Sequence, residues 1–250
     1  MRQHLSLFAV AAALAFAGAA QADITIPKVD YPALPRQAKS AEGFAPPGWK
    51  IEKVVSGDLN GDGAPDLVMV LKDADPKNSI KNDGLGSDPF DTNPRILAVA
   101  FARKDGGYDL VVENHLLIPR PTATNLEDFL SESGGVSVKN GSLRVALYLF
   151  ADAGGWDMGT TTYTFRWTGG GFRLIGYDNV DTQRNTGQVT TISINYSTGK
   201  MITTTGRIDR KATRSVTAKA PASPGGFDQV GDGMAFDPQH PETPGQPDDQ

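Results

Sequence analysis

The feature that most constrains the fold of this chain is a close succession of short apolar runs separated by glycine-rich turns. Each run has the length and the residue types of a strand. The runs cover residues 50–55, 67–71, 96–103, 108–113, 136–139, 143–150, 161–168, 172–177, 189–196 and 200–205. Helical periodicity is confined to residues 125–130, where it predicts a turn or two of helix. The pattern therefore predicts an all-β domain.

Turn signals between the runs predict that neighbouring strands are antiparallel. Residues 140–141 are Asn-Gly, a strong hairpin signal, and residues 169–171 and 197–199 mark two further hairpins. A faint internal repeat relates residues 99–114 to residues 163–178, because each is a strand, a glycine-rich turn and a second strand. We therefore expect antiparallel meanders that form a small, irregular β-propeller-like domain, with a β-sandwich as the alternative.

The first 22 residues have the features of a signal peptide. Arg2 is followed by an apolar stretch over residues 5–17, and residues 20–22 form an A-x-A cleavage signal. The apolar stretch is shorter than the roughly 20 residues that span a bilayer, so it favours a cleaved signal over a membrane anchor. We expect the mature chain to begin at Asp23.

Composition divides the remaining chain into three segments. Residues 23–48 contain five prolines and are predicted to form an extended N-terminal arm. Residues 49–207 hold all the strand signals and are predicted to form the β domain. Residues 208–250 are dominated towards their end by Pro, Gly, Asp and Gln, which predicts a disordered C-terminal tail, although it contains Phe227, Met234 and Phe236.

Charge and cysteine content limit the location and the partners of the protein. The formal net charge of −5 makes nucleic acid and anionic membrane surfaces improbable partners. The chain has no cysteine, which excludes a disulfide framework and a lipid-modified cysteine. Export without disulfides indicates the periplasm. We expect a monomer that does not insert into membranes.

The segment GDLNGDGAPDL has the spacing of a calcium loop. Oxygen-bearing side chains stand at positions 1, 3, 5 and 9 with glycine at position 6, so that Asp58, Asn60, Asp62 and Asp66, together with the Ala64 carbonyl, could surround Ca2+. It is not an EF-hand, because position 12 lies in an apolar run. The alternative is a metal-free Asp/Asn/Gly turn, but three carboxylates within nine residues would repel one another without a cation.

Few residues in the predicted domain could support catalysis. His115 is its only imidazole, so Cys- or His-based nucleophilic triads and His/Cys zinc sites are effectively excluded. We interpret His115 as a structural residue. A hydrolase that uses two carboxylates would need only a pair of facing acids, and no pair stands out in the sequence. We therefore expect that the protein is not an enzyme.

The glycine-rich loop over residues 151–160 carries the most informative aromatic residue. Trp156 either packs back onto the core or is presented to a partner, in which case it would be the central contact with Asp157 beside it. A second polar insertion, residues 73–94, could extend the calcium site or form a partner surface, although a mobile solvated loop is the default interpretation.

The calcium loop resembles those of FG-GAP and VCBS repeats, in which an apolar strand follows the last aspartate. With the signal peptide and the stretches GGVSVKNGSLRVAL, YTFRWTGGGFRLIGYDN and NTGQVTTISINYSTGKM, the chain resembles exported bacterial proteins that include periplasmic immunity proteins of Xanthomonas-type antibacterial type IV secretion systems. This resemblance implies a propeller-like fold, bound Ca2+ at the five loop positions, and a loop that plugs the cleft of a lysozyme-like peptidoglycan hydrolase.

The resemblance leads to two functional hypotheses. The first is a periplasmic calcium-binding immunity protein that inhibits a peptidoglycan hydrolase by inserting a loop, with Trp156 in the most plausible loop. The alternative is a calcium-stabilised module that binds a glycan or an envelope protein. A concave strip of exposed aromatic residues would favour this alternative, whereas a protruding aromatic loop would favour the inhibitor.

Overall fold

A computed structural model describes residues 24–130 and 135–246. The predicted signal peptide, residues 1–22, and the predicted first residue of the mature chain, Asp23, lie outside the described residues. The described part is almost entirely β-structure, which confirms the predicted fold class. No helix in this part of the chain is long and apolar enough to span a membrane.

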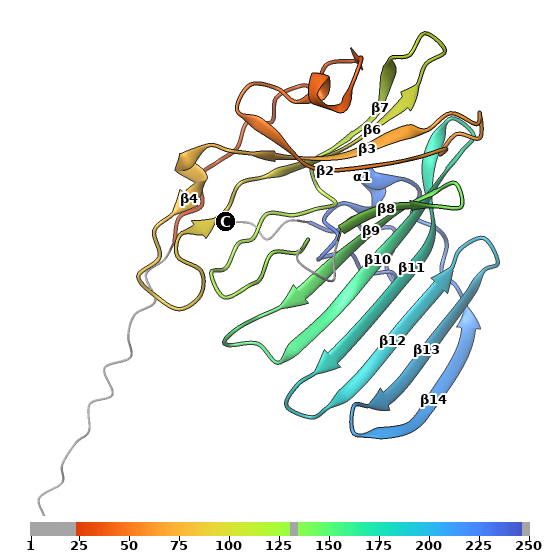
Figure 1. Cartoon of the computed structure of the whole chain (residues 1–250). Helices are drawn as coiled ribbons and strands as arrows, with labels where there is room; N and C mark the ends of the chain where they lie inside the picture. The colour runs from red at the N-terminus through yellow and green to blue at the C-terminus, as the bar shows by residue number, and fades with distance from the viewer. Residues whose placement is uncertain (1–23, 131–134, 247–250) are drawn as a thin grey trace, which may run out of the picture.

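Antiparallel pairing organises the strands into two curled sheets and a small ribbon (Figure 1). The five-stranded sheet has the order β1-β7-β6-β3-β2, formed by Gln37–Ala38, Tyr108–Asn114, Arg95–Ala102, Asp66–Asp73 and Trp49–Gly57. The ribbon pairs β4 (Ser79–Ile80) with β5 (Phe90–Asp91). Short 3-10 helices, η1 (Ala41–Phe44) and η2 (Pro76–Asn78), lie in the connections.

The second sheet is a seven-stranded antiparallel meander in which every strand pairs with its neighbour in sequence. Its strands are β8 (Gly135–Lys139), β9 (Ser142–Phe150), β10 (Asp157–Thr168), β11 (Gly171–Gln183), β12 (Gln188–Asn195), β13 (Lys200–Arg207) and β14 (Arg210–Lys219). The predicted hairpins at residues 140–141, 169–171 and 197–199 are all present. The two repeat-like segments are hairpins of different sheets, β6–β7 and β10–β11.

Strands β3 and β6 have both faces covered, which explains why their sequences are continuously apolar. Val68 and Val70 point into the main core, where they meet side chains of the seven-stranded sheet such as Leu143. Met69 and Leu71 point the opposite way into a second core, which the N-terminal arm closes with two buried residues, Leu34 and Phe44. The arm is therefore packed against the sheet along part of its length.

The prediction of a disordered tail over residues 208–250 is wrong for the part that the structure describes. Residues 210–219 form β14, and a short helix, α1 (Phe227–Val230), packs beneath the seven-stranded sheet. The Phe227 ring stacks on Phe165 with centroids 4.1 Å apart, and Phe236 packs on Tyr163 and Tyr177. The segment that holds α1 and Phe236 is ordered because its aromatic residues fill the curve of this sheet, a contact that composition does not report.

Two local predictions also change. Residues 125–130 form no helix; Leu126 instead makes an isolated antiparallel bridge with Ala151. The insertion over residues 73–94 contains η2, β4 and β5, and it leaves β3 at the end opposite to the predicted calcium loop. Because β3 is eight residues long, the two loops are separated by roughly 25 Å of strand. The insertion is therefore too far away to extend the predicted calcium site.

We expect Phe227→Ala to lower the free energy of unfolding by about 3–5 kcal/mol, because it leaves a cavity against two aromatic rings of the core. Urea unfolding of the mature protein measures the change. Gln239→Ala, an exposed position in the same segment, is the control and should change little. Equal stabilities for all three proteins would mean that the C-terminal segment does not pack onto the sheet.

Candidate functional site

The predicted calcium loop joins β2 to β3 and folds back over the Asp58 carboxylate. The two oxygens of Asp58 accept hydrogen bonds from the backbone N–H groups of Gly61 (2.7 Å) and Gly63 (3.0 Å). Both glycines have φ near +85°, a conformation that residues with a Cβ atom rarely adopt. Glycine at these two positions therefore permits the tight turn that surrounds Asp58.

Asn60 and Asp62 lie in the same turn and contact each other. Asn60 Nδ2 donates to Asp62 Oδ2 over 3.1 Å, and Asn60 Oδ1 accepts from the Asp62 N–H over 2.9 Å. Asp62 Oδ1 accepts from the Ala64 N–H over 2.8 Å. The structure thus brings the side-chain oxygens of positions 1, 3 and 5 into one turn, as the spacing predicts.

Asp66 has a different environment from the other predicted ligands, because its side chain is fully buried at the start of β3. Its Oδ2 accepts from the Leu59 N–H (2.8 Å) and its Oδ1 from the Ala102 N–H (2.9 Å). Burial raises the pKa of this carboxyl, although both hydrogen bonds oppose the shift. Asp66 therefore ties the loop to the end of β6.

The donor set of the loop suits calcium in part. Asp58, Asn60 and Asp62 offer hard oxygen ligands from one turn, which is the chemistry that Ca2+ prefers. Both oxygens of Asp66 are already held by backbone N–H groups. Within the described residues, no group of three or more His, Cys, Asp or Glu side chains is arranged to hold a metal ion. Calcium binding stays a prediction, in which the first three residues would supply the ligands.

The loop between β9 and β10 presents Trp156 to solvent. Its side chain is 61% exposed, so the alternative in which Trp156 packs into the core is wrong. Among the Phe, Tyr and Trp residues within 24–130 and 135–246, Trp156 is also the only one that is exposed. Asp157, the other predicted contact residue, is exposed beside it at the start of β10.

Arg184, which sequence analysis did not single out, holds the Trp156 loop in place. Its Nη2 donates to the carbonyls of Ala151 and Gly155, each over 2.6 Å, and its backbone N–H donates to the Trp156 carbonyl over 2.7 Å. The guanidinium also lies over the Phe150 ring, 4.5 Å from the centroid. A lone arginine after a strand carries no sequence signal, so only the fold reveals this role.

A second anchor joins the same loop to residues 123–130. Asn125 Nδ2 donates to the Ala153 carbonyl over 2.5 Å, and the Asp152 N–H donates to the Asn125 carbonyl over 2.9 Å. The loop is thus fixed at both of its sides while its aromatic tip stays exposed. Such pre-organisation lowers the entropy cost of binding a partner.

Asp157 and Asp181 form a diagonal pair of carboxylates on neighbouring strands, because Asp157 pairs with Gln183 and Asp181 with Gly159. Burial raises the pKa of Asp181, and the negative charge of Asp157 raises it further. A carboxylate-based hydrolase needs two neighbouring acids, one of them with a raised pKa, and this pair meets that requirement. Neither residue lines the cavity described next.

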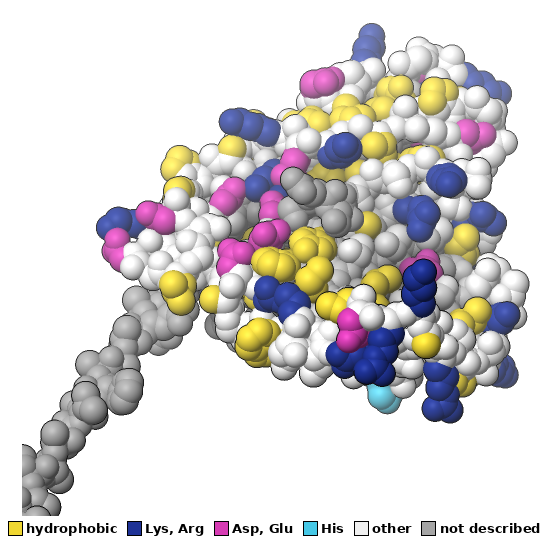
Figure 2. Space-filling model, turned by 60° about the horizontal axis from the view of Figure 1, so that its bottom comes forward, with side chains coloured by type: hydrophobic (Ala, Val, Ile, Leu, Met, Phe, Trp, Pro, Cys, Tyr) yellow, Lys and Arg dark blue, Asp and Glu magenta, His cyan; other side chains and the backbone are white. Residues whose placement is uncertain are grey.

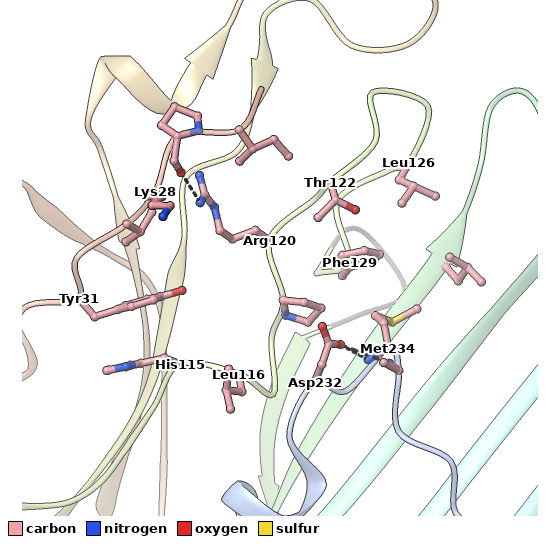
Figure 3. Close-up of a pocket in the computed structure, with 16 residues that line it drawn as sticks. Lys28, Tyr31, His115, Leu116, Arg120, Thr122, Leu126, Phe129, Asp232 and Met234 are labelled. Atoms are coloured by element: carbon pink, nitrogen blue, oxygen red, sulfur yellow. Dashed lines mark hydrogen bonds between the residues drawn. The ribbon is translucent and has the colours of Figure 1, made fainter. Parts of the chain in front are cut away.

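A cavity of about 620 Å³ lies between the N-terminal arm, residues 115–129 and residues 232–235 (Figure 3). His115 lines it and stacks on Tyr31, with centroids 4.2 Å apart. His115 Nε2 lies 3.4 Å from Glu113 Oε1, too poorly oriented for a hydrogen bond. Arg120 spans the wall and donates to the carbonyls of Pro27 and Thr92. His115 therefore packs against the arm, in keeping with a structural role.

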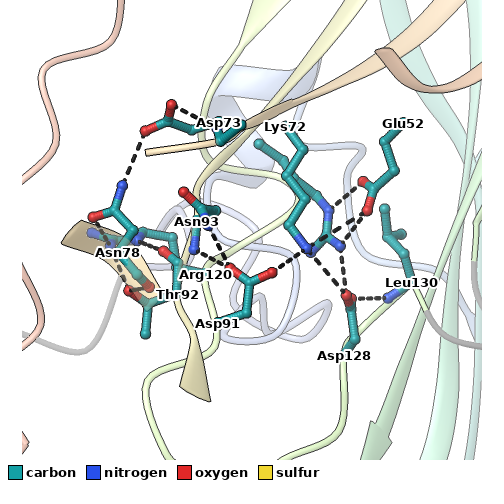
Figure 4. A network of polar contacts seen from close by, with 12 residues as sticks. Glu52, Lys72, Asp73, Asn78, Asp91, Thr92, Asn93, Arg120, Asp128 and Leu130 are labelled. Atoms are coloured by element: carbon teal, nitrogen blue, oxygen red, sulfur yellow. Dashed lines mark hydrogen bonds and ion pairs between the residues drawn. The ribbon is translucent and has the colours of Figure 1, made fainter. Parts of the chain in front are cut away.

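A cluster of charged side chains holds the 73–94 insertion and residues 123–130 against the five-stranded sheet (Figure 4). The almost completely buried Arg95 guanidinium makes a two-pronged contact with Glu52 (2.6 and 2.7 Å) and also binds Asp128 (2.5 Å). Lys72 pairs with Asp91 of the insertion over 2.8 Å. The insertion is therefore anchored at its base and is not a free solvated loop.

Comparisons of the chain with protein-family models, with curated proteins and with solved structures found no match.

If the loop binds calcium, Asp62→Asn and Asp66→Asn should behave differently. At a calcium concentration 100 times the Kd, binding should stabilise the parent protein by about 2.7 kcal/mol. Asp62→Asn should lose that increment and match the parent in chelator. Asp66→Asn should lose about 1–3 kcal/mol in both conditions, because a buried N–H loses its acceptor. Thermal unfolding with calcium and with chelator measures both, and equal parent curves would refute calcium binding.

The charge cluster predicts that the stability of the fold depends on pH through the ionisation of Asp128. Burial raises the pKa of this carboxyl, but the hydrogen bond and the positive charge of Arg95 outweigh it, so that the net pKa is lowered. The stability that Asp128 contributes is thus present above its ordinary pKa and is lost as pH falls through the lowered value. Asp128→Asn should cost about 1–2 kcal/mol at pH 7 and less at pH 2.

Urea unfolding at both pH values tests this prediction. Asp83→Asn is the control, because Asp83 forms an exposed pair with Lys81 on the same insertion and should contribute little at either pH. A cost for Asp128→Asn that is equal at pH 7 and pH 2 would show that its charge does not stabilise the fold.

Proposed function

We propose that the protein is a periplasmic, non-enzymatic inhibitor of a lysozyme-like peptidoglycan hydrolase and that the Trp156 loop enters the active-site cleft of that enzyme. The observation that carries this proposal is the exposure of Trp156 on a loop that Arg184 and Asn125 hold from two sides. The partner class comes from the resemblance of the sequence to periplasmic immunity proteins, together with its predicted signal peptide.

The physical argument concerns the cost of leaving Trp156 in water. An indole ring is among the largest apolar groups that a chain can expose, and interface energies concentrate on such rings when a cleft desolvates them. The loop gains no stability from exposing the ring, because its anchors are backbone carbonyls and the Arg184 side chain. A rigid loop with an exposed aromatic tip suits insertion into a concave site.

The calcium loop has a supporting role in this proposal. It lies in the connection between β2 and β3, whereas Trp156 precedes β10 in the other sheet. Bound Ca2+ would cross-link the Asp58–Asp62 turn, in a protein that has no disulfide to stabilise it. The ion would therefore stabilise the scaffold and would not contact the hydrolase.

The glycan-binding alternative has less support. A sugar-binding surface commonly uses several aromatic faces, and Trp156 is the only exposed Phe, Tyr or Trp in the described part of the chain.

The carboxylate pair supports a second candidate, a hydrolase that uses Asp181 as the acid and Asp157 as its partner. In that case the protein alone would lyse peptidoglycan, and Asp181→Asn would abolish the activity.

Inhibition of peptidoglycan lysis tests the proposal. The mature protein is titrated into a turbidity assay containing a lysozyme-like hydrolase purified from the secreted fraction of the same organism. The parent protein should inhibit, and Trp156→Ala should weaken inhibition about 30-fold, as expected for the loss of a contact worth about 2 kcal/mol. Leu85→Ala, which truncates an equally exposed apolar residue on the 73–94 insertion, should inhibit like the parent.

A third variant separates contact from positioning. Arg184→Ala keeps the indole but removes the two side-chain hydrogen bonds of one of the two anchors, so it should weaken inhibition while hydrogen exchange over residues 152–157 becomes faster. Unchanged inhibition by Trp156→Ala would exclude this loop as the plug. Lysis by the protein without added hydrolase would favour the carboxylate-pair enzyme.

A further inference from the structure

Strand β14 leaves one long edge of the seven-stranded sheet open. It is the last strand in the sheet order, it pairs on one side with β13, and all ten of its residues are exposed. At the other end of the sheet, β8 packs against β2, and Val138 lies against Gly57. The edge strand β2 of the five-stranded sheet is interrupted by a bulge between Ile51 and Lys53. β14 pairs with β13 without interruption from Arg214 to Lys219, before a register shift of its own, and this is the longest regular edge of the described fold.

The β13–β14 hairpin is strongly basic although the protein is acidic. Residues 200–219 hold six Lys or Arg residues and a single acid, Asp209, which gives a net charge of +5 in a chain whose total is −5. Figure 2 shows Lys and Arg side chains spread over the visible face, with several of them close together at its lower right. The cationic residues are Lys200, Arg207, Arg210, Lys211, Arg214 and Lys219.

Like charges are paired across this hairpin at both of its ends. Lys200 lies opposite Lys219, and Arg207 lies opposite Arg210. Cross-strand pairs of equal charge are destabilising, and only Arg207 has a carboxylate partner in the hairpin, Asp209. An anionic group placed along the edge would relieve this repulsion.

The register of β14 shows which backbone groups the open edge offers. The Ala220 N–H donates to the Gly199 carbonyl over 2.8 Å, so residues of the same parity, such as Ala218 and Val216, face β13. The N–H and C=O groups of Ser215, Thr217 and Lys219 consequently face outward. A peptide strand that adds to this edge would find its hydrogen-bonding groups already aligned.

A second copy of the chain is a poor occupant of this edge. If the β14 strands of two copies paired, the cationic side chains of one copy would lie close to those of the other. Each copy would bring five such side chains: Arg210, Lys211, Arg214 and Lys219, and the nearby Arg207. Charged edge strands of this kind prevent self-association. The same charges attract a strand of opposite sign, so the charge selects the partner.

We infer that the open edge of β14 is a docking site for an extended acidic peptide segment of another protein, which adds as an eighth antiparallel or parallel strand. The backbone groups of Ser215, Thr217 and Lys219 would supply the ladder, and Arg210, Arg214 and Lys219 would pair with acidic side chains. This surface is separate from the Trp156 loop and does not depend on the proposed hydrolase.

Binding of a synthetic strand tests the inference on the intact mature protein. The probe is a fluorescein-labelled nine-residue peptide of alternating Glu and Val, followed by anisotropy at low and at physiological salt. It should bind, and a Lys/Val peptide of the same length should not. A Glu/Val peptide N-methylated on alternate residues keeps the charge but cannot complete the ladder, so it should bind at least tenfold more weakly.

Protein variants locate the binding edge. Arg214→Glu should weaken the Glu/Val peptide at least tenfold, whereas Lys104→Glu, the same charge change in the exposed β6–β7 turn, should have little effect. Trp156→Ala should bind the peptide like the parent, which separates this site from the inhibitor loop. Equal binding of the methylated and unmethylated peptides, or equal effects of Arg214→Glu and Lys104→Glu, would overturn the inference.

Discussion

The fold depends on the burial of β3 and β6 from both sides. Their alternate residues enter two separate cores, one shared with the seven-stranded sheet and one closed by the N-terminal arm. This double burial makes the five-stranded sheet a rigid base, because no residue of Val68–Leu71 can move without disturbing one core or the other. Both the loop over residues 58–66 and the 73–94 insertion start from the ends of β3 and take their positions from it.

Polar groups are used in this structure chiefly to fix connections. Asp66 fixes the β2–β3 loop, the Arg95 cluster fixes the insertion, and Arg184 fixes the Trp156 loop. In each case a side chain binds backbone groups or opposite charges near the margin of a sheet, where water is partly excluded and such contacts are stronger. The exposed indole is therefore held in a definite position by contacts that do not involve the indole itself.

The two proposed surfaces differ in chemistry and lie on different elements. The Trp156 loop offers one large apolar group on a rigid support, which suits a cleft. The β14 edge offers backbone hydrogen-bonding groups and positive charge, which suit an extended acidic segment. Because the two surfaces are separate, each can be tested alone. Both belong to the seven-stranded sheet, one on the β9–β10 loop and one on its edge strand.

The sequence by itself determined the fold class, the ten central strands and the hairpins, because strand runs and glycine turns act over a few residues. It also placed Asp58, Asn60 and Asp62 in one turn, since loop spacing is local. Only the tertiary structure decided that the C-terminal segment packs through Phe227 and Phe236, that Trp156 faces solvent, and that Arg184 supports it. These outcomes depend on contacts between residues far apart in the chain, whose energies no local pattern records.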